Sequence, residues 1–293
     1  MGNGIGVTAA RVVERAQLSL ARAVLNAPKK MPAPIVLGEA GWMSVTLQWA
    51  VTVLQEWGTI MAAPVSRTDR AVLVGDVTAA QAGAKCSELG VRVVGAAELI
   101  FGLGGGQELH FRNKAAWKKK LKKAVAVAAQ EEYERMLRAV GGGLGDAYLA
   151  IKPKFGRAPW LDTARCSVRW GRRQSIYQLI RLRGAGHHLR TVTCYYWWTN
   201  HDDQCPCGQH RQDPPHWLFG CDRTARPRQK FHEWYAKVRG VGAGARLAAL
   251  AHQQQWAEVM GWLDGGGGWT EEERGVMLSA VLDFVDEVER ISP

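Results

Sequence analysis

The sequence has no hydrophobic run of the roughly 18 residues that a transmembrane helix needs. Its start, MGNGIG, lacks a basic region followed by an apolar run, so we expect no secretory signal, and Gly6 stands where N-myristoylation favours Ser or Thr. The glycine clusters at 101–107 and 141–145 lack the Gly-Lys-Ser/Thr ending of a phosphate-binding loop. We therefore expect an intracellular protein, cytoplasmic or nuclear, with no membrane partner.

Acidic residues are scarce in the middle of the chain. From Lys152 to Arg190 there are ten Lys or Arg and one acidic residue, whereas Glu258 to Arg290 holds nine acidic residues and two arginines. The formal net charge is +11 over 293 residues. This asymmetry favours a polyanion such as nucleic acid as partner of the basic centre, although a solvated basic face would give the same pattern.

Apolar residues recur mostly at three- and four-residue steps, so we expect a mostly α protein. The pattern predicts helices over 8–25, 44–61, 113–140, 172–182, 245–263 and 270–291, with Ser44 as an N-cap and Thr270 with Glu273 as a capping box. Residues 62–112 give no clear prediction. The helix at 113–140 carries a lysine run in its first half: Lys118, Lys119, Lys120, Lys122 and Lys123. The helix at 172–182 should bury Ile176, Leu179 and Ile180 and turn its arginines outward.

Cysteine is rare, but three of the six cysteines fall in "CPCGQHRQDPPHWLFGC" at 205–221. Cys205, Cys207, His216 and Cys221 are separated by one, eight and four residues, a set suited to one tetrahedral zinc ion. Four protein ligands leave no open position, which favours a structural ion. Cys194 or His210 could replace one ligand, and the alternative is a loop with free thiols.

The neighbouring pair Asp202 and Asp203 lies in the polar stretch "TNHDDQC", without the rigid strand support that a two-metal polymerase site needs. We also find no nucleophile–base pair of recognisable spacing. The sequence therefore predicts no catalytic residue.

Three stretches in order, "LGEAGW" with the tryptophan-rich helix after it, "LIRLRGAGHHLR" at 179–190 and "CPCG…HWLFGC", resemble the C-terminal part of reverse transcriptases from non-LTR (LINE-type) retrotransposons. The resemblance covers roughly 5–225. It implies a thumb-like helical segment at 1–65, a connector at 66–112, a basic helical linker at 113–200, a Cys-Cys-His-Cys zinc knuckle at 201–225 and a helical tail at 226–293. The Asp-Asp palm of that family is not among these residues, nor is a ribonuclease H or endonuclease pattern. The expected function is nucleic-acid binding, to RNA or an RNA–DNA hybrid, by part of an RNA-directed DNA polymerase that is not an enzyme on its own.

On this reading Cys205, Cys207, His216 and Cys221 bind one structural Zn²⁺. The nucleic-acid contacts are expected from Lys118, Lys119, Lys122, Arg172, Arg173, Arg181, Arg183, His187 and Arg190. Tyr195, Tyr196, Trp197 and Trp198 could stack on unpaired bases or pack against the knuckle. The alternative is a zinc-stabilised protein-interaction domain that recruits a partner through the acidic C-terminal helices.

Overall fold

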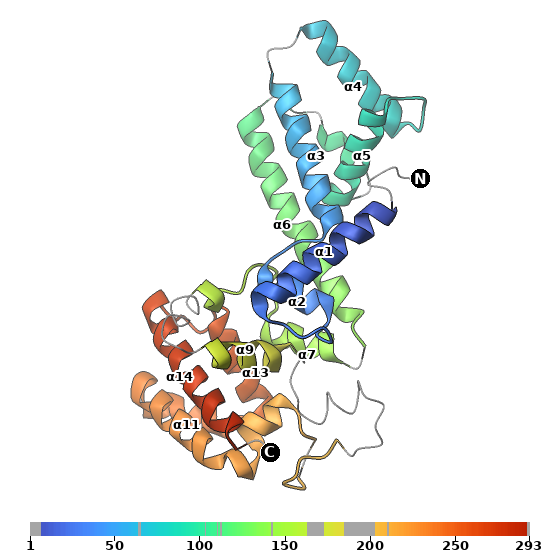
Figure 1. Ribbon diagram of the computed structural model, residues 1–293. Helices are drawn as coiled ribbons and strands as arrows, with labels where there is room; N and C mark the ends of the chain where they lie inside the picture. Colours follow the sequence, from blue (N-terminus) through green and yellow to red (C-terminus); the bar gives the residue numbers. More distant parts are fainter. Residues whose placement is uncertain are drawn as a thin grey trace. The chain divides into compact units, whose positions relative to one another are not determined.

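The computed structural model describes residues 7–63, 66–102, 104–109, 111, 113–141, 143–162, 173–184, 203–209 and 211–291. Throughout these ranges the chain is mostly helical and contains no β-strand (Figure 1), so the predicted mostly α class is confirmed. No helix in the described part of the chain combines the length and the hydropathy needed to cross a membrane.

The chain divides into two compact units. Unit 1 comprises Met1–Ser19 and Met43–Arg135, and unit 2 comprises Leu20–Trp42 and Met136–Pro293. Helices α1 (Val7–Leu25) and α6 (Lys114–Arg138) each cross a boundary between the units. The apolar row predicted on α1 is exposed, with Val12 60 % and Val24 63 % accessible.

Unit 1 is built around α3 (Val45–Ala62), which starts where the Ser44 hydroxyl accepts a hydrogen bond from the Leu47 amide at 3.2 Å. Its buried face packs against α5 (Glu88–Phe101), and α5 in turn packs against α4 (Arg67–Gln81) and the short 3-10 helix η1 (Gly105–Leu109). Helix α6 approaches α3 closely because Gly58 has no side chain. A Cβ atom there would lie 2.4 Å from Nε1 of Trp117. Trp117 and Leu121 are buried, which turns the lysine run of α6 toward solvent.

Unit 2 contains α2 (Ala33–Ala40), α7 (Leu144–Ile151), α9 (Arg173–Arg183), α11 (Ala225–Arg239), α12 (Val241–Ala249), α13 (His252–Leu263) and α14 (Glu271–Glu289). The predicted inward row of α9, Ile176, Leu179 and Ile180, is buried. Thr270 and Glu273 form the predicted capping box of α14. The single helix predicted over 245–263 is two helices, because Leu250 and Ala251 adopt extended backbone between α12 and α13.

A buried ionic cluster joins α2, α9 and the end of α13. The Arg183 guanidinium donates to Oε1 of Glu39 at 2.9 Å and to Oδ2 of Asp264 at 2.7 Å, and its side chain is fully inaccessible. The Tyr148 hydroxyl also donates to Oε1 of Glu39, at 2.7 Å. Burial alone would lower the pKa of Arg183, but Asp264 and Glu39 outweigh it and raise the pKa, so this side chain stays charged. The cluster corrects the prediction that Arg183 faces outward and contacts a nucleic-acid backbone.

Candidate metal centre

A short hairpin presents the first two cysteines. An isolated antiparallel bridge joins Gln204 to Arg211, and the Gln212 amide donates to the Asp203 carbonyl at 2.8 Å. At the start of the loop between them, the Gly208 amide donates to the Cys205 carbonyl at 2.8 Å. Gly208 has a φ of +79°, a left-handed conformation that favours glycine. The resulting tight turn holds Cys205 and Cys207 close together.

The other two side chains lie at the ends of a single π-helical turn, η2 (His216–Gly220), which is followed by Cys221. The Asp213 carboxylate accepts a hydrogen bond from the His216 amide at 2.8 Å, and the Cys221 amide donates to the His216 carbonyl at 2.7 Å. The wider π turn folds the chain so that His216 and Cys221 can approach the same point as the hairpin cysteines.

The four predicted side chains come together. One ligand atom from each of Cys205, Cys207, His216 and Cys221 lies within 4.8 Å of all the others. Sγ of Cys205 is 3.6 Å from Sγ of Cys221, and Sγ of Cys207 is 3.2 Å from Nε2 of His216. A tetrahedral ion with metal–sulfur bonds of about 2.3 Å would separate its sulfur ligands by about 3.8 Å. The spacing therefore fits a shared metal ion, and it is too long for a disulfide.

The site is shielded from solvent. Cys205, His216 and Cys221 are buried, and Cys207 is half-buried. Burial raises the pKa of the Cys205 thiol to about 12 and also raises the pKa of Cys221. A bound cation would reverse this preference by stabilising the thiolates, and its binding would release protons.

The metal-binding loop is anchored in the core of unit 2. Trp217, Leu218 and Phe219, which lie between His216 and Cys221, are buried. The centroid of the Phe219 ring lies 5.5 Å from the ring centroid of Phe284 on α14 and 6.3 Å from that of Phe231 on α11. The four ligand residues are thus part of a larger hydrophobic core.

The remaining sequence-predicted residues fall into three groups. Lys118, Lys119 and Lys122 are exposed on α6, and Arg181 is half-buried on α9. Asp203 belongs to the hairpin, where its carboxylate pairs with Arg211. Outside the described residues, or with undescribed side chains, lie Arg172, Arg173, His187, Arg190, Cys194, Tyr195, Tyr196, Trp197, Trp198, Asp202 and His210.

One residue near the site carried no sequence signal. The ring of His252, at the start of α13, meets that of His216 edge-on at 5.9 Å. It is separated from the cysteine-rich stretch by the whole of α11 and α12, so spacing could not have connected it with the site.

Comparison with known proteins adds nothing to this geometry. No family model, curated protein or solved structure matches the chain. Its function must therefore be inferred from its own residues.

We expect Gly220→Ala to weaken metal binding. A Cβ atom at position 220 would lie 2.9 Å from Nδ1 of His216 and 3.3 Å from the His252 ring, so the His216 imidazole would have to move. Displacing a ligand in this way should lower metal affinity by about 10–100-fold, measured by competition with a chromophoric chelator. Gly242→Ala is the matched control, because nothing lies within 4 Å of its added Cβ. Equal affinity in the two variants would contradict the expected role of Gly220.

Proposed function

We propose that this protein binds nucleic acid, as RNA or an RNA–DNA hybrid, through the exposed lysines in the first half of α6. We also propose that Cys205, Cys207, His216 and Cys221 hold one structural zinc ion. The observation that carries the proposal of nucleic-acid binding is the exposure of all five clustered lysines on an ordered helix. We assign no catalytic step to these residues.

The lysine face consists of Lys118, Lys119, Lys122 and Lys123, which are exposed in the first half of α6. No ion pair within the described ranges involves these four, whereas Lys120 pairs with Glu108. Residues four apart lie one above the other on a helix, so Lys118–Lys122 and Lys119–Lys123 form two adjacent rows of positive charge about 6 Å long. A phosphate backbone, with a charge every 3.4 Å or so along each strand of a duplex, can engage several of these ammonium groups together.

Zinc is the ion that the donor set supports. Three thiolates and one imidazole are soft or borderline ligands that suit zinc, and four protein ligands close a tetrahedral site. The buried position of three of the ligands also supports a structural rather than a catalytic ion.

The ligand spacing of one, eight and four residues, together with the "LIRLRGAGHHLR" stretch, supports descent from the C-terminal region of a non-LTR retrotransposon reverse transcriptase. We propose this origin for the chain, with α3 as the counterpart of a thumb helix. In that setting the lysine face would hold template RNA or the hybrid, while polymerisation would require a separate palm.

Filter binding to a structured RNA and to an RNA–DNA hybrid at several salt concentrations tests the function. We expect the wild-type protein to show a steep salt dependence. Replacing Lys118, Lys119, Lys122 and Lys123 with Gln should reduce the slope of log K against log salt by about 3. Raising the salt from 50 to 200 mM should therefore weaken binding by the variant about 60-fold less than it weakens binding by the wild type.

The matched control removes four exposed basic side chains elsewhere, in the variant Arg11→Gln/Lys29→Gln/Lys85→Gln/Arg246→Gln. It has the same net charge as the α6 variant and should keep most of the salt slope. Equal slopes for the two variants would show that overall charge, and not the lysine face, governs binding, and would reject the proposal.

A further inference from the structure

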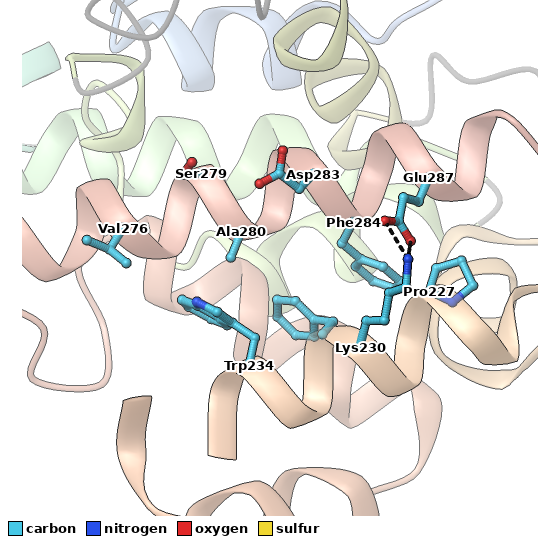
Figure 2. Close-up of a pocket in the computed structure, with 10 residues that line it drawn as sticks. Pro227, Lys230, Trp234, Val276, Ser279, Ala280, Asp283, Phe284 and Glu287 are labelled. Atoms are coloured by element: carbon cyan, nitrogen blue, oxygen red, sulfur yellow. Dashed lines mark hydrogen bonds and ion pairs between the residues drawn. The ribbon is translucent and has the colours of Figure 1, made fainter. Parts of the chain in front are cut away.

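An apolar groove runs between α11 and α14 in unit 2, with a volume of about 270 Å³. Its apolar lining comes from Pro227, Phe231 and Trp234 on α11 and from Val276, Ala280 and Phe284 on α14. The rings of Phe231 and Phe284 stack at 5.0 Å and form its floor. Figure 2 shows the Trp234 side chain directed toward α14, where Val276 and Ala280 point back toward it.

The apolar surface at this groove is only partly covered. Trp234 is half-buried, and Val276 is 49 % exposed. Val238, one turn beyond Trp234 on α11, is 42 % exposed. Removing apolar surface from water is favourable in proportion to its area, so a partner that covered these side chains would be held by the contact.

The two walls of the groove carry opposite charge. Helix α11 has five basic residues and one acidic residue, whereas α14 has seven acidic residues and one arginine. On α11, the exposed Arg226, Lys230 and Lys237 lie along one helical face. On α14, the exposed Glu272 and Asp283 share a face, and Figure 2 shows Asp283 on the side of α14 turned away from Trp234.

The charges of the two walls are also spaced alike along the groove. Arg226 and Lys237 are eleven residues apart, as are Glu272 and Asp283. Two ion pairs fix the antiparallel register of the helices: Lys230 with Glu287 at 2.9 Å, and Arg239 with Glu273 at 3.9 Å. Lys230 therefore lies near the levels of Asp283 and Glu287, and Lys237 lies at a level between Glu272 and Asp283.

We propose that a second copy of this chain docks on the groove through a two-fold axis parallel to α11 and α14. That rotation places the basic wall of each copy against the acidic wall of the other at the same level, and it brings the two Trp234–Val276 surfaces into contact. Because each copy carries one basic wall and one acidic wall, its surface is complementary to the same surface of a second copy, as an isologous interface requires. We infer this dimer from neither the zinc site nor nucleic-acid binding.

Sedimentation of the full-length protein, together with paired charge reversals, tests the dimer. At about 100 µM we expect the wild type to have the mass of a dimer, since interfaces of modest size commonly dissociate near 1 µM. Arg226→Glu/Lys237→Glu makes the exposed faces of both walls net acidic, and Glu272→Lys/Asp283→Lys makes both exposed faces basic. Each variant alone should be monomeric, whereas an equimolar mixture of the two should restore the dimer.

Two further variants separate this interface from other forms of association. Trp234→Ala should weaken the dimer at least tenfold while leaving its helical circular dichroism intact. Arg92→Glu/Arg246→Glu changes basic residues that do not line the groove and should leave the dimer unchanged. A monomeric wild type at 100 µM or so would overturn the proposal, and so would a mixture that stayed monomeric. If the groove bound only some other protein, the wild type would be monomeric in this experiment.

Discussion

Replacing Cys205 and Cys221 together with serine should abolish stoichiometric zinc binding and lower the melting temperature by roughly 8–16 °C. Zinc present at about 1,000 times its dissociation constant stabilises the folded state by about 4 kcal/mol, and each kcal/mol shifts the melting temperature by about 2–4 °C in a protein of this size. Metal analysis and differential scanning calorimetry, with and without a chelator, measure the two effects.

The loss should nevertheless leave part of unit 2 folded. Trp217, Leu218 and Phe219 bury the loop independently of the ion, whereas isolated zinc fingers unfold without it. Cys86→Ser is the control, since this half-buried thiol lies in unit 1 outside the metal-binding group. Unchanged stability and zinc content in the double variant would show that the four side chains hold no metal ion.

The second large effect is expected from Arg183→Met, which should destabilise the protein by about 3–5 kcal/mol. The substitution keeps most of the side-chain volume but leaves the carboxylates of buried Glu39 and half-buried Asp264 without their guanidinium partner. Urea unfolding of the variant measures the loss.

Two comparisons isolate the cause. Arg181→Met, two residues earlier on the same helix, removes a half-buried arginine that makes no ion pair in the described structure, and it should cost much less. The triple variant Glu39→Gln/Arg183→Met/Asp264→Asn should regain part of the stability, because neither carboxylate of the cluster is then left charged without its guanidinium partner. If Arg183→Met cost no more than Arg181→Met, the cluster would not stabilise the fold as described.

The sequence predicted the parts of the structure whose causes are local. The capping box at Thr270 and Glu273 and the N-cap at Ser44 depend on residues three apart, and both are present. The cysteine and histidine spacing likewise identified a cluster that one short loop can assemble. Helices α4 and α5 were missed, although Ser66 and Ser87 cap them, because apolar periodicity in 62–112 was too weak to interpret.

The burial of Arg183 was not predicted, because its partners are distant in sequence. Glu39 is 144 residues earlier and Asp264 is 81 residues later. Position 183 continues the row of Ile176, Leu179 and Ile180 at helical spacing, but an arginine there was assigned to the polar face because of its charge. Only the carboxylates that other elements of unit 2 bring to α9 compensate that charge in the core. His252 near the metal-binding group was missed for the same reason.

The aromatic contacts of Phe219 connect the metal-binding loop with the groove between α11 and α14. This residue lies inside the π turn between His216 and Cys221, and its ring also contacts Phe284 and Phe231, the floor of the groove. An ion that orders the turn would therefore also order the surface on which a second copy docks. Thermodynamic reciprocity then requires that self-association tighten metal binding by the same factor. The fraction of the protein present as a dimer in the cell would therefore depend on both the zinc supply and the protein concentration.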